Sequence, residues 1–284
     1  MNAMAEYEHA ALARVVVQKW RDGLGDVQAD NVAEEVPVAL EYNGISHAVM
    51  LASPTNLEDF ALGFSLSEGI VAHPSELFDC EVSNLVDGIQ VQMRIASERF
   101  VMLKDRRRNL TGRTGCGLCG AETLQQAIRR PARVESHAKF SAAAIYAGLD
   151  AMQTQQNMQR HTGATHAAAW LAADGRITVV REDVGRHNAL DKLIGALARD
   201  RIDFSSGAAL ITSRASYEMV QKVATLGIGF LAAISAPTGL AIRLAEQTNV
   251  TLIGFVRQKS HVVYAHQNRL THDADLGRNE IWTS

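Results

Sequence analysis

Residues 208–256 alternate short apolar runs with amphipathic segments: Ala208-Ala-Leu-Ile-Thr212, Tyr217-Glu-Met-Val-Gln-Lys-Val-Ala-Thr225, Phe230-Leu-Ala-Ala-Ile-Ser235, Leu240-Ala-Ile-Arg-Leu-Ala-Glu-Gln247 and Thr251-Leu-Ile-Gly-Phe-Val256. The three apolar runs are typical of strands that are buried on both faces. The two segments between them have the apolar spacing of helices. Strands that alternate with helices predict βα units, and therefore a mostly parallel sheet with helices on both faces.

The preceding residues continue this alternation. Residues 166–171 and 177–182 are expected to form strands on either side of an Ala-Asp-Gly turn, and residues 188–198 an amphipathic helix. One long helix is expected over residues 141–159. The sequence therefore predicts an α/β domain that covers residues 131–284.

The N-terminal part of the chain has a different pattern of apolar and polar residues. Two β-like runs, residues 36–42 and 45–51, are separated by Asn43-Gly44, which is the strongest short signal for a β-hairpin. Residues 57–68 have the apolar spacing of a helix, and Gly69 would end it because glycine readily adopts positive φ. This pattern of strands and one helix indicates an α+β unit.

The remaining N-terminal segments complete that unit. Residues 80–103 alternate apolar and polar side chains and are expected to form paired strands, and residues 10–20 form a first strand or a short helix. We therefore expect a smaller α+β domain over residues 1–105, dominated by antiparallel strands. Residues 106–130 would form a cysteine loop and a helix that link the two domains.

Composition excludes several classes of protein. The chain has 284 residues, 47% of them hydrophobic, which is enough for one large domain or two modest ones. Its net charge of −3 gives no reason to expect nucleic acid. No signal peptide begins the sequence, and no apolar run approaches the ~18 residues that a membrane span needs. An odd number of cysteines, three, favours a reducing compartment, so we expect a cytoplasmic protein without membrane association.

Two of the three cysteines lie in the glycine-rich stretch Arg113-Thr-Gly-Cys-Gly-Leu-Cys-Gly120. A helix is expected over residues 121–130, so Cys116 and Cys119 would lie near its N-terminus, where the helix dipole lowers a thiol pKa. Such a pair can be a redox dithiol, half of a zinc site, a carrier of sulfane sulfur, or two packing cysteines. We favour a reactive thiolate on a flexible loop, and leave redox chemistry and sulfur transfer open at this point.

Polar side chains follow the predicted strands of the second half. Ligands bind at the carboxyl ends of strands in α/β folds, and hydroxyl and amide groups there suit phosphate. Arg257 and Lys259 would present positive charge to a phosphate or pyrophosphate, whereas His166 and His187 could also be packing histidines, the interpretation favoured for His166. The segments concerned are residues 160–166, 181–188, 212–216, 235–239 and 257–261.

Several stretches together resemble a known family nearly end to end, the formate dehydrogenase accessory sulfurtransferase (FdhD/NarQ) family. The most specific are the Cys-Gly-Leu-Cys-Gly loop and the run Glu-Asp-Val-Gly-Arg-His-Asn-Ala-Leu-Asp-Lys. The matching stretches are residues 34–38, 62–70, 115–120, 162–167, 181–192, 213–220, 235–238 and 252–255.

The resemblance implies a homodimer and a cytidine-deaminase-like three-layer α/β/α fold for the C-terminal domain. It implies that a cysteine desulfurase passes sulfur to the loop, where Cys116 bears the persulfide and Cys119 assists. The sulfur would then reach the metal of Mo-bis(molybdopterin guanine dinucleotide), which GDP would mimic, and so mature the formate dehydrogenase apoenzyme. The implied cofactor contacts are Phe255, Val256, Arg257, Gln258, Lys259 and Ser260, and no metal ligand is implied in the chain itself.

Two other classes of function remain open. One is a dithiol oxidoreductase, which would cycle a disulfide between Cys116 and Cys119. The other is a non-catalytic chaperone that carries the molybdenum cofactor and needs neither cysteine. A measurable reversible disulfide would favour the first, and activity without cysteines would favour the second.

Overall fold

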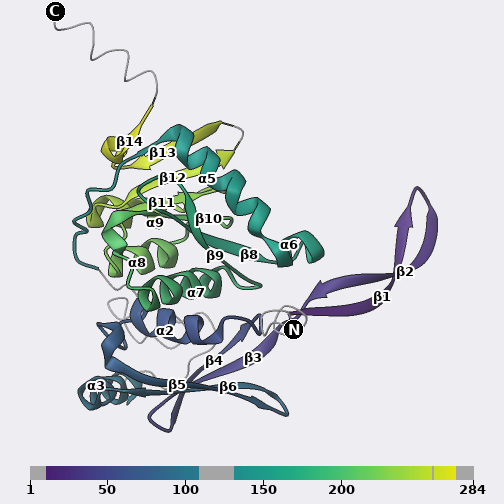
Figure 1. The fold of residues 1–284 in the computed structure, drawn as a ribbon, viewed down its shortest axis with the longest axis horizontal. Coiled ribbons are helices and arrows are strands. Elements are labelled where there is room, and N and C mark those ends of the chain that lie inside the picture. The colour runs from purple at the N-terminus through teal and green to yellow at the C-terminus, as the bar shows by residue number, and fades with distance from the viewer. Residues whose placement is uncertain (1–10, 109–130, 258, 273–284) are drawn as a thin grey trace, which may run out of the picture.

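The computed structural model describes residues 11–108, 131–257 and 259–272 (Figure 1). No helix within these residues is both long enough and apolar enough to span a membrane. The C-terminal half contains a six-stranded sheet in the order β13-β12-β11-β10-β8-β9. Its strands are β8 His166–Leu171, β9 Ile177–Asp183, β10 Ala208–Ile211, β11 Phe230–Ala233, β12 Thr251–Arg257 and β13 Ser260–Ala265.

The sheet is mixed, so the expectation of a mostly parallel sheet was wrong. Only the pairs β10–β11 and β11–β12 are parallel, whereas β8 pairs antiparallel with both β9 and β10, and β12 with β13. The reason is the length of the connections. Short turns join β8 to β9 and β12 to β13, and a short turn can only make an antiparallel pair, because a parallel neighbour needs a crossover.

Helices cover both faces of this sheet, as predicted. The strand β10 shows the division, because Ala209 and Ile211 enter one buried cluster and Ala208 and Leu210 the other. One face packs against α7, α8 and α9, and the other against α5 (Figure 1), which gives three layers. These helices are α5 Ala142–Gln155, α7 Arg186–Arg199, α8 Tyr217–Thr225 and α9 Gly239–Thr248.

The long helix expected over residues 141–159 is interrupted. The helix α5 ends at Gln155, and a second helix, α6 Asn157–Thr162, begins after Gln156, whose φ of −78° and ψ of 83° are not helical. The carboxylate of Glu182 on β9 accepts the backbone N–H groups of Met158 and Gln159, both at 2.9 Å. In an unbroken helix these two groups would donate to the preceding turn, so a carboxylate from a distant strand stabilises the break.

The N-terminal half is built on a four-stranded sheet in the order β4-β3-β6-β5. The predicted hairpin is confirmed, because Asn43 and Gly44 have φ values of 47° and 80°, the left-handed turn that matches strand twist. The segment 97–103 was wrongly expected to be a strand; it begins a helix, and Phe100 and Leu103, three residues apart, pack against the core. The elements are β3 Val36–Tyr42, β4 Ile45–Ala52, α2 Leu57–Ser67, β5 Leu77–Leu85, β6 Gly88–Ile95 and α3 Ser97–Arg108.

A long two-stranded ribbon projects from the body of the protein (Figure 1). It consists of β1 Leu12–Arg21, which the sequence suggested as a strand or short helix, and β2 Leu24–Ala33, which was not predicted. The strand pairing places Val16, Trp20 and Val27 on the same face of the ribbon, and all three are more than half exposed. The sequence pattern does not predict the strand β2, because charged and amide residues interrupt its apolar positions.

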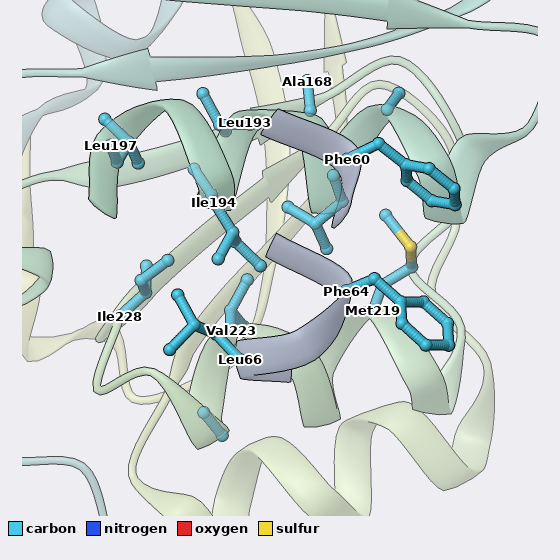
Figure 2. Packing of buried hydrophobic residues seen from close by; sticks show 14 of the residues in the cluster. Phe60, Phe64, Leu66, Ala168, Leu193, Ile194, Leu197, Met219, Val223 and Ile228 are labelled. Carbon is cyan, nitrogen blue, oxygen red and sulfur yellow. The ribbon is translucent and has the colours of Figure 1, made fainter. Parts of the chain in front are cut away.

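The two halves of the chain share one hydrophobic cluster, centred on the crossing of α2 and α7 (Figure 2). At the crossing the backbones touch. A Cβ on Gly63 would lie 1.7 Å from the carbonyl oxygen of Asp191, and one on Gly195 would lie 1.8 Å from that of Asp59. Only glycine fits at both positions. The division into domains at residues 105 and 131 stays a prediction, and the shared cluster means that the halves pack as one body.

We predict that Gly63→Ala lowers the free energy of unfolding by about 3 kcal/mol or more, because the new methyl group meets rigid helix backbone. Urea denaturation of the purified protein measures it. The matched control is Gly239→Ala at the start of α9, where a Cβ meets only the flexible end of Arg243, at 3.6 Å. Its stability should stay within about 1 kcal/mol of the parent. Equal stability of the two variants would contradict the close crossing.

Candidate functional site

The polar loops of the second half meet at one edge of the six-stranded sheet. Backbone hydrogen bonds link them in sequence: Thr212 N–H donates to Ala167 O at 3.1 Å, Ile234 N–H to Ile211 O at 3.0 Å, and Phe255 N–H to Ser235 O at 3.3 Å. The first bond joins the segment after β10 to the start of β8, the second joins the segment after β11 to the end of β10, and the third joins the end of β12 to the segment after β11. The predicted strand-end loops at residues 212–216 and 235–239 therefore lie at a common edge of the sheet.

A pocket of about 590 Å³ opens at this edge. Its volume lies within the range of about 300–1,000 Å³ that is typical of small-molecule sites. Amides and hydroxyl groups dominate the wall, and the described residues that line it include one permanent cation and no carboxylate. The lining residues are Gln153, Gln156, Gln159, Arg160, Gly163, Ala164, Thr165, His166, Thr212 and Ile234.

Hydrogen bonds hold the loop between α6 and β8 in place. The side-chain carbonyl of Gln159 accepts the backbone N–H of Thr165 at 2.9 Å, and the Thr165 hydroxyl donates to Glu182 at 3.1 Å. Gly163 permits the turn because its φ is +67°. The wall of the pocket is thus formed before any ligand binds, which reduces the entropy lost on binding.

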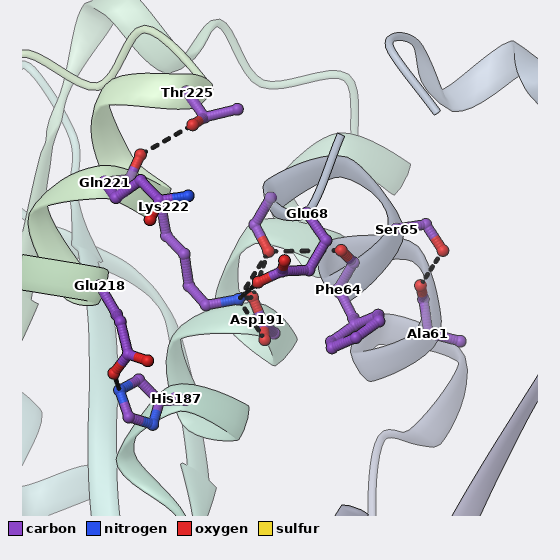
Figure 3. A network of polar contacts seen from close by, with 11 residues as sticks. Ala61, Phe64, Ser65, Glu68, His187, Asp191, Glu218, Gln221, Lys222 and Thr225 are labelled. Atoms are coloured by element: carbon purple, nitrogen blue, oxygen red, sulfur yellow. Dashed lines mark hydrogen bonds and ion pairs between the residues drawn. The ribbon is translucent and has the colours of Figure 1, made fainter. Parts of the chain in front are cut away.

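Two histidines stand on this edge in different environments. Burial, together with the charge of Arg186, lowers the pKa of His166, so its imidazole is neutral at pH 7 and can both donate and accept. His187 Nε2 lies 2.7 Å from Glu218, and this contact lowers the pKa of the Glu218 carboxyl (Figure 3). His166 lines the pocket and His187 does not, so only His166 is placed to contact a ligand there.

Asp183, at the end of β9, is fully buried and bound on several sides. Its carboxylate lies 2.6 Å from Lys192 Nζ and accepts the N–H groups of Ser53 at 3.0 Å and Gly185 at 2.7 Å. Lys192 also donates to Ser53 O at 3.0 Å. Removing one partner of a buried ion pair typically costs about 3–5 kcal/mol. These members of the conspicuous run at residues 181–192 are therefore structural, and they bind the second half to the segment after β4.

A second buried cluster ties α8 to the same helix pair (Figure 3). Lys222 donates to both carboxylate oxygens of Asp191, at 2.9 and 3.0 Å, to the Ser67 hydroxyl at 2.9 Å and to Glu68 at 3.1 Å. Its three ammonium protons are thus all engaged, which offsets the cost of taking the charge out of water. This lysine is satisfied within the protein and is not a candidate for ligand binding.

The segment expected to contact the cofactor lies at the end of β12 and the start of β13, and it does not line the pocket. Arg257 and Lys259 are exposed and could meet an anion, but the Val256 side chain is buried and offers only its backbone. Phe255 has a φ of 51° and a side chain that is 38% exposed. The Ser260 hydroxyl donates to Arg257 O at 2.8 Å, and Gln258 lies outside the described residues.

Cys116, Cys119 and the helix expected over residues 121–130 also lie outside the described residues. The remaining cysteine, Cys80 on β5, is packed against the core, and burial raises the pKa of its thiol to about 12. In the parts of the chain that the structure describes, no three His, Cys, Asp or Glu side chains are grouped in a way that could hold a metal ion.

Sequence periodicity missed the glutamines of the pocket, because residues 141–159 were interpreted as one amphipathic helix. Gln153, Gln156 and Gln159 come from the end of α5, the break and α6. A sequence signal was present, because four amides and no charged residue occur between residues 153 and 157.

Two polar side-chain atoms on this edge of the sheet, Arg186 Nε and Ser216 Oγ, are buried without a hydrogen-bond partner among the described residues.

Comparison with known proteins gives consistent matches. The FdhD/NarQ family model matches residues 33–271, which leaves most of the β1–β2 ribbon outside it. A sulfur carrier protein FdhD of Cupriavidus necator is 61% identical over 96% of this chain and 95% of its own length. One of Bordetella petrii is 58% identical over 86% of this chain and 87% of its own length.

A solved structure has the same fold. It is described as a putative formate dehydrogenase accessory protein from Desulfotalea psychrophila, and it aligns with a TM-score of 0.72 over 92% of this chain and all of its own. At 21% identity this likeness speaks for the fold alone. The family match over most of the chain and the high identity of the relatives decide the assignment. The chain belongs to the FdhD/NarQ family.

Proposed function

We propose that this protein is a sulfur carrier with sulfurtransferase activity. It accepts persulfide sulfur from a cysteine desulfurase and transfers it to Mo-bis(molybdopterin guanine dinucleotide), the cofactor of a formate dehydrogenase. The observation that carries the proposal is family membership, together with relatives named sulfur carrier protein that align over 95% and 87% of their length. We further propose that it acts as a homodimer in the cytoplasm.

Elimination among the three cysteines supports Cys116 and Cys119 as the sulfur-bearing thiols. A thiol must ionise to attack a persulfide. Burial raises the pKa of the Cys80 thiol to about 12, so it stays protonated at pH 7. Its partly buried position against the core also restricts the approach of another protein. The glycine-rich loop is left as the place where sulfur can be carried.

The first step is an exchange of sulfur between two cysteines. The Cys116 thiolate attacks the terminal sulfur of the desulfurase persulfide, a new S–S bond forms at Cys116, and the desulfurase cysteine leaves as a thiolate. One thiolate is consumed and one is released, so charge is balanced. Cys119 is the neighbouring thiol that assists. Transfer of the terminal sulfur to the metal of the cofactor, which is the substrate of this protein, would break the S–S bond and leave Cys116 as a thiolate, and the sulfur would take two electrons from the metal to become its sulfido ligand.

The edge of the sheet supports a cofactor with phosphate groups. Arg257 and Lys259 are exposed at the end of β12, and a guanine dinucleotide carries phosphates that such cations bind. The segment 255–260 spans the end of β12, the parallel neighbour of β11, and residue Ile234 after β11 lines the pocket. Arg257, Lys259 and the pocket therefore lie at the same edge of the sheet, where a large nucleotide can contact both the cations and the pocket.

We predict that Cys116→Ala folds but fails to activate formate dehydrogenase, because no thiolate accepts the sulfur. Enzyme activity in cells that carry only the variant measures this. After incubation with desulfurase and cysteine, mass spectrometry should find an added sulfur atom on the loop peptide of the parent and none on that of Cys116→Ala. The matched control is Cys80→Ala, which should accept sulfur and activate like the parent.

The outcomes separate the rival functions. Full activation by Cys116→Ala would overturn the role of Cys116, and the same test on Cys119→Ala ranks the two thiols. A cysteine-free chain that still activates the enzyme would favour a cofactor-carrying chaperone. A reversible Cys116–Cys119 disulfide that turns over a disulfide substrate would favour an oxidoreductase.

We predict that GDP raises the thermal midpoint, because a ligand that binds only the folded state stabilises it, by about 2.7 kcal/mol at a hundred times Kd. The double variant Arg257→Ala/Lys259→Ala should reduce this shift, and it should reduce it less at high salt, where the parent also loses the charge contribution. The control is Arg176→Ala, an exposed arginine in the β8–β9 turn. No shift of the parent at millimolar GDP would count against the nucleotide site.

A further inference from the structure

Two histidines face each other near the C-terminal end of the described chain. His261 lies near the start of β13, and His272 follows the short strand β14 Leu270–Thr271. Their Nε2 atoms are 3.2 Å apart, whereas their ring centroids are 5.2 Å apart, so the two Nε2 atoms point toward one another. Neither histidine is among the described residues that line the pocket. The pair is therefore separate from the pocket.

Regular secondary structure holds the two rings in place. His261 shares a face of β13 with Val263, which packs against the buried cluster beneath α5. Tyr146 on α5 packs against the same cluster, and its hydroxyl lies 2.7 Å from His261 Nδ1. The strand β14 pairs with β7 Phe140–Ser141, directly before α5, and this pairing positions His272. The three side chains thus come from elements that meet at α5 (Figure 1).

The distance between the two Nε2 atoms fits a shared metal ion. A neutral imidazole binds a metal through one ring nitrogen, and Zn²⁺–N bonds are about 2.0–2.1 Å long. Two such nitrogens on one tetrahedral ion lie about 3.3–3.4 Å apart, close to the observed 3.2 Å. Without an ion, two facing lone pairs repel each other, so one nitrogen must carry a proton toward the other. An ion can take the place of that proton.

Tyr146 supports the ring orientation that a metal ligand needs. Histidines that bind metals almost always use their other ring nitrogen for a hydrogen bond, which fixes the ring and its tautomer. When His261 Nδ1–H donates to the phenol oxygen of Tyr146, the lone pair of the ring lies on Nε2, the atom that faces His272. Tyr146 is thus a positioning residue for His261.

The ligand type determines which ions fit. Imidazole nitrogen favours late first-row ions such as Zn²⁺, Ni²⁺ and Cu²⁺, whereas Mg²⁺ and Ca²⁺ prefer oxygen ligands. Because His272 is exposed, water can supply the ligands that the two histidines do not. The described residues provide no third His, Cys, Asp or Glu ligand, so the ion would exchange with solvent, unlike the ion of a closed structural site.

We propose that His261 and His272 form a binding site for a late first-row divalent cation, and that Tyr146 positions His261 for it. The bound ion would join two residues that are eleven positions apart, one on β13 and one after β14, and so fasten the end of the described chain to the six-stranded sheet. This inference does not depend on the sulfur carrier function.

The test titrates the full chain with Ni²⁺ by isothermal calorimetry, and with Mg²⁺ as an ion that imidazole should not bind. Because the loop thiols can also bind Ni²⁺, every protein in the series carries Cys116→Ala and Cys119→Ala. We expect His261→Ala and His272→Ala each to weaken Ni²⁺ binding tenfold or more. The matched control is His137→Ala, at an exposed histidine in the segment before β7, which should bind Ni²⁺ like the parent.

Two further readouts distinguish a metal site from a contact that only supports the fold. Tyr146→Phe keeps the ring and loses the hydroxyl, and we expect it to weaken Ni²⁺ binding about tenfold, because the hydrogen bond that orients a metal-binding histidine contributes this much to affinity. Ni²⁺ should raise the thermal midpoint of the parent and of His137→Ala, because it binds only their folded state, and should leave those of His261→Ala and His272→Ala unchanged.

Equal Ni²⁺ affinity in the parent and in both histidine variants would overturn the proposal, because it would indicate adventitious binding by scattered surface histidines. A parent that binds no Ni²⁺ at millimolar concentration would overturn it as well. So would variants whose thermal midpoint falls in the absence of metal while their Ni²⁺ affinity stays the same, since the two histidines would then have a structural role only.

Discussion

The contact between α2 and α7 is the constraint on which the rest of the structure depends. The two helices approach so closely that their backbones meet at Gly63 and Gly195. Buried charges surround the crossing, among them Asp59, which lies 2.8 Å from Arg181 and 2.7 Å from Arg199. Because the buried Asp59 carboxylate needs these partners to offset its loss of hydration, the pairs help to fix the relative position of the helices. The same contact fixes the start of α7, and with it the loop beside the pocket.

Local periodicity predicted much of the fold. The strands and helices between residues 208 and 256 were recoverable because each buried run is short and bounded by polar turns. The gathering of the loops followed from the direction of those strands. The mixed order of the sheet and the break at Gln156 could not be predicted in this way, because they depend on contacts with residues far away in the sequence, such as Glu182.

The candidate site was predicted less completely than the fold. The run at residues 181–192 identified the family, yet Asp183 and Lys192 within it hold the two halves together and are not among the described residues that line the pocket. Buried charged residues that stabilise a fold form sequence motifs that are as recognisable as those of catalytic residues. Neutral amides such as Gln156 leave almost none, because glutamine is common on exposed helices and only its burial distinguishes it.

The helix crossing also bears on how the chain is made. Gly63 leaves the ribosome roughly 130 residues before Gly195, and at about 5–20 residues per second this delay is on the order of ten seconds. Until α7 emerges, the side of α2 that carries Asp59 and Gly63 lacks the helix that covers it. The nascent N-terminal half therefore cannot complete its folding before α7 has emerged. It presents a hydrophobic helix of the kind that chaperones bind, and a prematurely terminated chain would keep that helix exposed.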